Sequence, residues 1–215
     1  MMRLDLSLYL VLDRDLGGAR SMAETARAAV AGGATVVQLR DKDAGTEGLV
    51  AAGREIRAAL AGSSVPLIVN DDIEAALALD AEGIHVGQGD LPATEARRLM
   101  GGNRIVGVSV EDAQAILAID PSIVDYVGVG PVFATATKPD HKPPIGFDGL
   151  ARLVALSPVP TVAISGLKAN HVADVLTSGA DGMAVVSAIC GQPDPQAAAI
   201  RIADEIRRWR ETNGR

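Results

Sequence analysis

Cysteine and aromatic residues are scarce in this chain of 215 residues. There is one cysteine, Cys190, and aromatic residues make up 2% of the sequence. A single cysteine excludes an internal disulfide framework and favours a reducing compartment. With so few aromatic rings, the chain has almost nothing on which nucleic-acid bases could stack.

Positive charge is also in deficit. The chain has 20 Lys and Arg residues against 27 Asp and Glu residues, a formal net charge of −7. General nucleic-acid binding depends on an excess of positive charge, so no nucleic-acid partner is expected. Small anions would have to bind at a local group of basic side chains.

Long apolar runs are absent from the start of the chain. The first run, Leu6 to Leu12, lies between Asp5 and Asp13. Because the run is this short and has an acidic residue on each side, it is expected to be neither a signal peptide nor a membrane helix, which needs roughly 20 apolar residues. We therefore expect a soluble, cytoplasmic protein that has no membrane partner.

The sequence does contain a regular alternation of short β-rich runs and longer Ala- and Leu-rich segments. Eight such units can be counted, which predicts a single α/β domain over residues 1–215 with the (β/α)8 TIM-barrel fold. The predicted strands are Leu6–Leu12, Thr35–Leu39, Pro66–Val69, Gly83–Val86, Ile105–Ser109, Tyr126–Val129, Thr161–Ile164 and Gly182–Val186. The predicted helices are Met22–Ala31, Gly48–Leu60, Ile73–Leu79, Ala93–Leu99, Ala113–Ile119, Gly149–Leu156, Ala169–Thr177 and about Gln196–Arg210.

Polar residues that follow the predicted strands are the candidates for function, because barrel enzymes place their chemistry at the carboxyl ends of the strands. Asp71 follows the third strand and Asp90 the fourth. Neighbouring strands lie about 4.8 Å apart, so these carboxylates can converge on one hard cation such as Mg²⁺. The other candidates are Gln38, Arg40, Lys42, Asn70, Ser109, Thr135, Thr137, Lys138, Ser165, Gly166 and Ser187.

These candidates predict two anion-binding sites in one cavity at the carboxyl ends of the strands. Arg40, Lys42 and Lys138 could hold a polyanion against the metal, and backbone N–H groups after the seventh and eighth strands could hold a phosphate. The pattern therefore favours two small phosphorylated substrates.

Six stretches, in order, resemble the thiamine phosphate synthase family over essentially the whole chain. They are residues 37–42, 69–71, 83–92, 107–109, 130–138 and 179–189. The resemblance implies that an aminopyrimidine methyl diphosphate joins a thiazole phosphate, with Mg²⁺ as cofactor and release of diphosphate. A homo-oligomer is compatible with the sequence.

The resemblance also assigns roles residue by residue. Asp71 and Asp90 would ligate Mg²⁺, and Arg40, Lys42, Ser109 and Lys138 would act in catalysis. The pyrimidine diphosphate would be bound by Gln38, Leu39, Arg40, Asp41, Lys42, Asn70, Ser109 and Lys138. The thiazole phosphate would be bound by Thr135, Ala136, Thr137, Gly166, Val186 and Ser187.

The chain departs from the family pattern at two positions. Ala134 stands where the family usually has a proline, and Ser165 replaces the first glycine of a pair. Neither change removes an expected ligand, although both could alter thiazole affinity.

Plainer interpretations compete with these roles. An aspartate that follows a strand is often a helix N-cap, and this could describe Asp71 or Asp90. We interpret His85, which lies within an apolar strand, as a hydrogen-bonded core residue, and Cys190 as a packing residue. At the level of the whole protein, the alternatives are a thiazole tautomerase and a non-catalytic sensor of thiamine intermediates.

Overall fold

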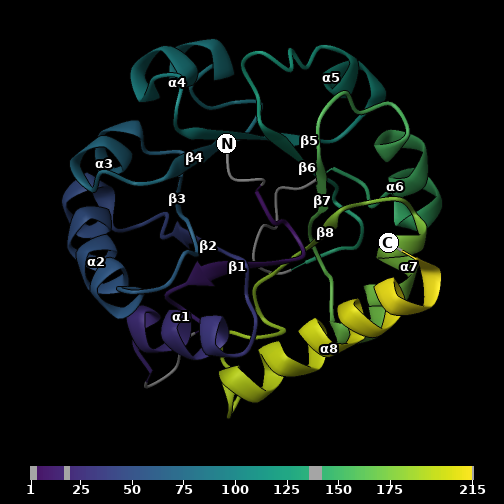
Figure 1. The fold of residues 1–215 in the computed structure, drawn as a ribbon. Coiled ribbons are helices and arrows are strands. Elements are labelled where there is room, and N and C mark those ends of the chain that lie inside the picture. The colour runs from purple at the N-terminus through teal and green to yellow at the C-terminus, as the bar shows by residue number, and fades with distance from the viewer. Residues whose placement is uncertain (1–3, 17–19, 136–141, 215) are drawn as a thin grey trace.

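The computed structural model describes residues 4–16, 20–135 and 142–214. Eight parallel strands form a closed barrel in sequence order, and β1 pairs with both β2 and β8. Helices surround the barrel, and the chain proceeds around this ring from its first to its last element (Figure 1). The predicted (β/α)8 TIM barrel is confirmed. Its strands are β1 (Leu8–Asp13), β2 (Val36–Arg40), β3 (Leu67–Asn70), β4 (Gly83–Val86), β5 (Ile105–Val110), β6 (Tyr126–Val129), β7 (Thr161–Ala163) and β8 (Gly182–Val185).

The helices follow the strands in the expected alternation. They are α1 (Met22–Ala31), α2 (Gly45–Ala59), α3 (Ile73–Ala78), α4 (Ala93–Met100), α5 (Ala113–Leu117), α6 (Gly146–Val154), the 3₁₀ helix η1 (Ala169–His171), α7 (Val172–Thr177) and α8 (Pro195–Asn213). Within the described part of the chain, none of them has both the length and the apolar character that a membrane crossing requires.

The starts of α2 and α6 were predicted three residues too late. Each helix begins at a glycine with positive φ, Gly45 at 61° and Gly146 at 63°. The preceding residues, Ala44 and Ile145, provide no side-chain cap. Because the usual polar N-cap signal is missing, the sequence gives no marker for the first turn of these helices.

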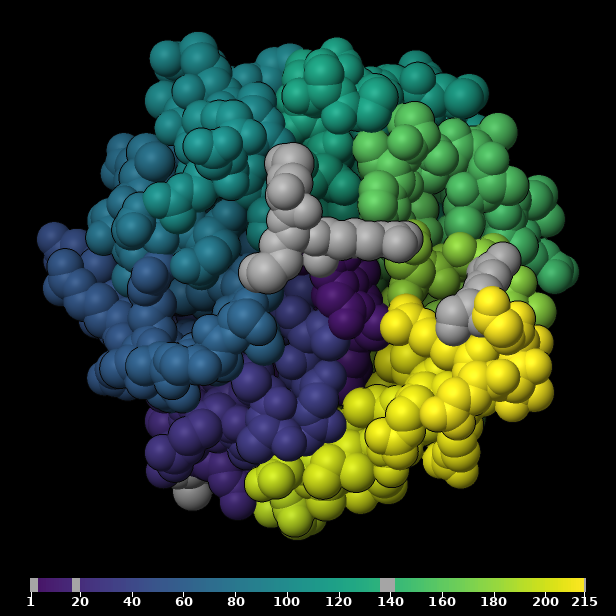
Figure 2. All heavy atoms as spheres, viewed as in Figure 1, coloured from purple at the N-terminus to yellow at the C-terminus, as the bar shows by residue number. Residues whose placement is uncertain are grey.

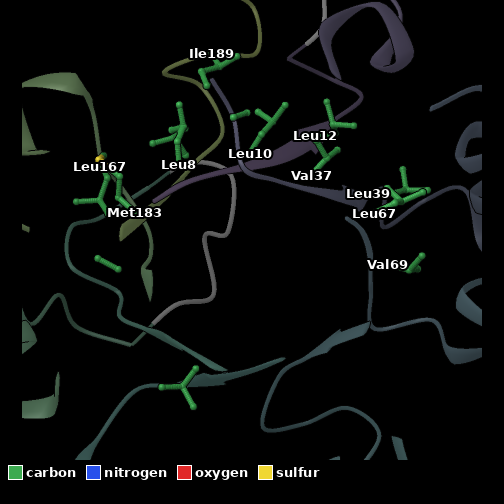
Figure 3. Close-up of a cluster of buried hydrophobic side chains, with 14 of the residues drawn as sticks. Leu8, Leu10, Leu12, Val37, Leu39, Leu67, Val69, Leu167, Met183 and Ile189 are labelled. Atoms are coloured by element: carbon green, nitrogen blue, oxygen red, sulfur yellow. The ribbon is translucent and has the colours of Figure 1, made fainter. Parts of the chain in front are cut away.

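The apolar residues of the strands divide between two layers. Alternate residues of β1, Leu8, Leu10 and Leu12, belong to a large cluster that includes buried residues of the surrounding helices (Figure 3). Tyr9 belongs to a second cluster, inside the barrel, with Leu6, Val36, Ile68, Tyr126, Val162 and Ala184. Since both faces of each strand are buried, the strands are apolar almost throughout, as the sequence predicts.

Contacts between the last helix and the first close the outer ring. α8 packs beside α1, and both lie next to β1 (Figure 1). In the space-filling view, early described residues, coloured dark purple, lie near the centre of this face, and later segments of the chain surround them (Figure 2). Because all eight strands are parallel, their carboxyl ends lie on one side of the barrel, where the candidate residues are found.

Candidate active site

A cavity of about 330 Å³ opens at the carboxyl ends of the strands. Residues from or just after all eight strands line it, so the closed barrel brings together positions that lie far apart in sequence. The predicted site residues that line this cavity are Gln38, Arg40, Lys42, Asn70, Asp71, Asp90, Ser109, Thr135, Gly166, Val186 and Ser187.

Five predicted site residues are not placed in the cavity. The side chain of Leu39 is fully buried in the outer core cluster, one position out of phase with Gln38 and Arg40. Asp41 forms an ion pair with Arg14, with 2.6 Å between Oδ2 and Nε, and does not line the cavity. The remaining three, Ala136, Thr137 and Lys138, lie outside the described residues.

Asp71 and Asp90 come together as the strand order predicts. β3 and β4 are adjacent and parallel, and the backbone N–H of Asp71 donates to the carbonyl of His85 across them, at 2.9 Å. The carboxyl groups of Asp71 and Asp90 interact directly. The amide of Asn70 donates to Oδ2 of Asp71 at 2.5 Å, which orients this carboxyl group.

The electrostatic environment of Asp71 suits a cation. Burial, followed by the hydrogen bond and the charge of Asp90, raises the pKa of Asp71 to about 6, although Asn70 and Arg40 act in the opposite direction. Two carboxylates this close repel one another when both are ionised. A bound divalent cation would remove this repulsion by neutralising both groups.

The alternative that these aspartates merely cap helices is wrong. The N-cap of α3 is the next residue, Asp72, whose side chain accepts from the N–H of Ala75 at 2.7 Å. The carboxylate of Asp90 instead accepts from the N–H of Gly87 at 2.8 Å, within the turn after β4. The N-cap of α4 is Pro92. Helix capping therefore does not account for Asp71 or Asp90.

The donor set around Asp71 and Asp90 fits Mg²⁺. Within the described ranges, no group of three or more His, Cys, Asp or Glu side chains is placed to hold a metal. Magnesium needs no such protein cage, because it is usually held by one or two carboxylates together with waters and substrate phosphates. The exposed position of Asp90 leaves room for those additional oxygen ligands.

Basic side chains flank the aspartate pair. Arg40, at the end of β2, lies 3.3 Å from Asp13 at the end of β1, measured from Nη1 to Oδ2, and the two residues are paired in the sheet register. Lys42 lines the same cavity from an exposed position. The acidic pair and these cations form a mixed-charge surface that is able to bind a metal diphosphate.

The other side of the cavity is formed by the loops after β6 and β7. Ser165 and Gly166 both have positive φ, at 73° and 71°. A Cβ on Gly166 would lie 2.6 Å from the Cβ of Phe133, so this close approach of the two loops requires glycine. The N–H of Phe133 donates to the carbonyl of Ser165 at 3.2 Å, which joins the loops.

Tyrosine residues at the floor of the cavity were missed by the sequence analysis. Tyr9 and Tyr126 line the cavity and are buried inside the barrel. Because both faces of their strands are apolar, the sequence alone did not separate inward from outward positions. Gln38 faces the cavity and is paired with Val11 in the register of β2 and β1. Because side chains alternate between the two faces of a strand, Tyr9, two residues before Val11, faces the same way.

Two plainer interpretations are confirmed. His85 is buried and hydrogen-bonded through both ring nitrogens, and it also lines the cavity. Cys190 is buried away from the cavity lining, and burial raises the pKa of its thiol to about 11. A thiol in this state is a packing group, because it is not ionised at neutral pH.

Comparison with known proteins places this site in one family. Residues 8–189 match the family model for thiamine monophosphate synthase. The chain is 50% identical to the thiamine-phosphate synthase of Xanthobacter autotrophicus over 195 residues, which is 91% of this chain and 92% of the relative. It is 45% identical to that of Albidiferax ferrireducens over 201 residues, or 94% and 92% of the two chains.

Solved structures agree with this assignment. Thiamine phosphate pyrophosphorylase from Pyrococcus furiosus superimposes with a TM-score of 0.86 at 32% identity, covering 97% of this chain and 99% of that one. A mutant tryptophan synthase α-subunit from the same organism has a TM-score of 0.68 at 18% identity and shares only the fold. The chain therefore belongs to the thiamine monophosphate synthase family.

Proposed function

We propose that this chain condenses 4-amino-2-methyl-5-(diphosphooxymethyl)pyrimidine with 4-methyl-5-(2-phosphooxyethyl)thiazole, forming thiamine phosphate and releasing diphosphate. Family membership supports the product. The observation that carries the proposal is the pair Asp71 and Asp90 beside Arg40 and Lys42 in one cavity. This combination suits a substrate whose leaving group carries several negative charges.

Charge on the departing diphosphate is the main barrier. The bond from the exocyclic methylene breaks, and the amino group of the pyrimidine can stabilise the resulting ring cation. Arg40, Lys42 and Lys138 would offset the charge that develops on the leaving oxygens, an effect that can be worth several kcal/mol. Mg²⁺ held by Asp71 and Asp90 would supply further positive charge at the same oxygens.

No general base is required for the second half of the reaction, because the thiazole nitrogen attacks with its own lone pair. The cavity residues agree with this requirement. Both nitrogens of His85 are engaged in hydrogen bonds, and Cys190 lies outside the cavity lining. Gln38, Asn70 and Ser109 would orient the pyrimidine diphosphate.

The thiazole phosphate would bind against the loops after β6, β7 and β8. Thr135, Gly166, Val186 and Ser187 line that side. The predicted set also includes Ala136 and Thr137, which lie outside the described residues. The apolar side chains of Ile164 and Val186, which also line the cavity, would exclude water from the reactive cation.

The test is to mix both substrates with Mg²⁺ and to follow diphosphate release and product mass. We expect release only when both substrates and the metal are present. Conversion of thiazole phosphate alone would favour a tautomerase, and substrate binding without product would favour a sensor. We also propose a cytoplasmic location, because a single cysteine suits a reducing compartment.

Replacement of Lys138 tests its assignment to the leaving group. Lys138→Ala should slow the bond-breaking step in single-turnover experiments more than it weakens thiazole binding. A change in thiazole affinity alone would show that Lys138 has a different role.

A further inference from the structure

A continuous chain of hydrogen bonds crosses the floor of the cavity. The amide Nε2 of Gln38 donates to the hydroxyl of Tyr9 at 2.9 Å, and the hydroxyls of Tyr9 and Tyr126 are 2.7 Å apart. The hydroxyl of Tyr126 lies 2.9 Å from Nδ1 of His85, whose Nε2 lies 2.9 Å from Oγ of Ser109. All five residues line the cavity, and they come from five different strands.

The direction of this chain follows from counting protons. Burial raises the pKa of both tyrosine hydroxyls, so each keeps its single proton. Because Tyr9 accepts from Gln38, its own proton is directed to Tyr126, and the proton of Tyr126 is then directed to Nδ1 of His85. The imidazole is therefore neutral with its proton on Nε2, from which it donates to Ser109.

The barrel holds the rings of this chain in place. Tyr9 and Tyr126 have ring centroids 5.9 Å apart, and those of His85 and Tyr126 are 5.5 Å apart. Beside them, a Cβ on Gly107 would lie 2.2 Å from Cζ of Tyr126. Glycine at this position of β5 is what makes room for the tyrosine ring.

We propose that Tyr9 and Tyr126 are positioning residues that fix the direction of these hydrogen bonds. As a result, the cavity accepts an aminopyrimidine and rejects an oxopyrimidine. This inference rests on the proposed function. With the direction derived above, the carbonyl oxygen of Gln38 remains to accept from an amino group, and the hydroxyl proton of Ser109 remains to donate to a ring nitrogen. An oxopyrimidine has the reverse pattern, a carbonyl acceptor beside a ring N–H donor.

The first test measures the tautomer of His85 by ¹⁵N nuclear magnetic resonance in the substrate-free protein. We expect the neutral Nε2–H form in the unaltered protein. Gln38→Glu places an acceptor against Tyr9, which should reverse the direction of the hydrogen bonds and move the imidazole proton to Nδ1. Tyr126→Phe interrupts the series of hydrogen bonds and should populate both tautomers. As a control, Thr161→Val removes a buried hydroxyl that has no partner in the described structure and should leave the tautomer unchanged.

The second test measures catalysis by Tyr126→Phe. The KM for the pyrimidine diphosphate should rise about 10-fold, while the KM for the thiazole phosphate stays the same. Selectivity for the amino over the oxo analogue should fall by a similar factor, whereas Thr161→Val retains it.

Two results would overturn the inference. One is a His85 tautomer that is the same in the unaltered chain, Gln38→Glu and Tyr126→Phe. The other is unchanged amino-over-oxo selectivity in Tyr126→Phe. Failure of the proposed function would be seen separately, as an absence of diphosphate release from the unaltered chain with both substrates.

Discussion

Asp71 has both a left-handed backbone, with φ of 61°, and a carboxyl group whose pKa is raised to about 6. In the unfolded chain this group would titrate near the ordinary value of 3.8. The stability that it contributes is therefore fully present below that value and is lost as the pH rises through about 6. In the metal-free protein at neutral pH, the ionised carboxylate opposes folding.

Asp71→Asn should remove the destabilisation that the ionised carboxylate causes in the metal-free protein. The variant should be more stable than the unaltered chain by roughly 1–2 kcal/mol at about pH 8 without metal, after allowance for solvent screening. Asparagine tolerates the left-handed backbone, so no new strain is introduced. The gain should disappear near pH 4, and urea unfolding at both pH values measures it. A loss of stability at the higher pH would contradict this account.

Ser165 is the second strained residue of the site. Its φ is 73°, a conformation that costs an L residue about 1 kcal/mol and glycine almost nothing. Ser165→Gly, which restores the glycine of the family pattern, should raise the free energy of unfolding by about 1 kcal/mol. Thermal or urea unfolding checks the change, and an unaltered or reduced stability would show that Ser165 forms compensating contacts.

Gly166→Ala provides the matched opposite case in the same loop. The new Cβ would meet Phe133 at 2.6 Å on a backbone with positive φ. We expect this variant to lose about 2 kcal/mol or more, and to bind thiazole phosphate less tightly because the loops must separate.

At the scale of elements, Arg97 ties α4 to the amino-terminal ends of neighbouring strands. Its guanidinium donates to the carbonyls of Ile123 at 2.9 Å and Arg104 at 2.5 Å, and to Oδ2 of Asp125 at 2.5 Å. The same carboxylate accepts from the N–H of Val106 at 2.7 Å, just inside β5. One planar cation therefore joins the segments that precede β5 and β6.

Arg97→Lys should destabilise the barrel by about 2–3 kcal/mol, because an ammonium group cannot reproduce this set of donors. Turnover per folded molecule should be unchanged, since this face of the barrel supports stability and not chemistry. Urea unfolding and active-site titration separate the two effects. A fall in turnover without a loss of stability would mean that Arg97 influences the site.

The order and position of the strands could be predicted from sequence because each is a short apolar run bounded by turn residues. Every predicted strand boundary is within two residues of the observed one. The candidate site residues could be predicted in the same way, because they are the polar residues directly after these apolar runs. The starts of α2 and α6 could not be predicted, because glycine with positive φ and no capping side chain opens both helices.

The inward residues were harder to predict for a different reason. Tyr9 and Leu10 are neighbours in β1, and both are buried, yet one faces the barrel interior and the other the helices. When both faces of a strand are buried, amino-acid composition does not show which residues face the barrel interior. The closure of the barrel decides this. The same alternation explains why Leu39, between Gln38 and Arg40, does not line the cavity.

At the scale of the whole molecule, Cys190 reports on unfolding because it is the only cysteine and is buried. Its pKa of about 11 means that the folded protein should react slowly with iodoacetamide at about pH 8, whereas the unfolded chain reacts fast. The labelling rate in increasing urea should follow the global unfolding curve. Rapid labelling of the folded protein would show that β8 and the following loop open locally.

The stability of the whole molecule should also depend on this thiol at alkaline pH. Because its pKa is higher in the folded state, its contribution is complete below the unfolded value and is lost as the pH rises toward 11. Cys190→Ala should remove this dependence. Unfolding curves of the two proteins between neutral and strongly alkaline pH make the comparison.

The central claim is that Asp71 and Asp90 hold a divalent cation against the departing diphosphate. The most direct measurement is diphosphate release during Mg²⁺ titration, with both substrates present, in the unaltered chain and in Asp71→Asn. We predict saturable dependence on Mg²⁺ in the unaltered chain, no release in chelator, and a rate about 100-fold lower in Asp71→Asn, because loss of a residue that only orients a metal ligand costs roughly 10–100-fold and loss of a direct ligand should cost at least as much. Undiminished release in chelator, or an unchanged titration in the variant, would contradict the claim.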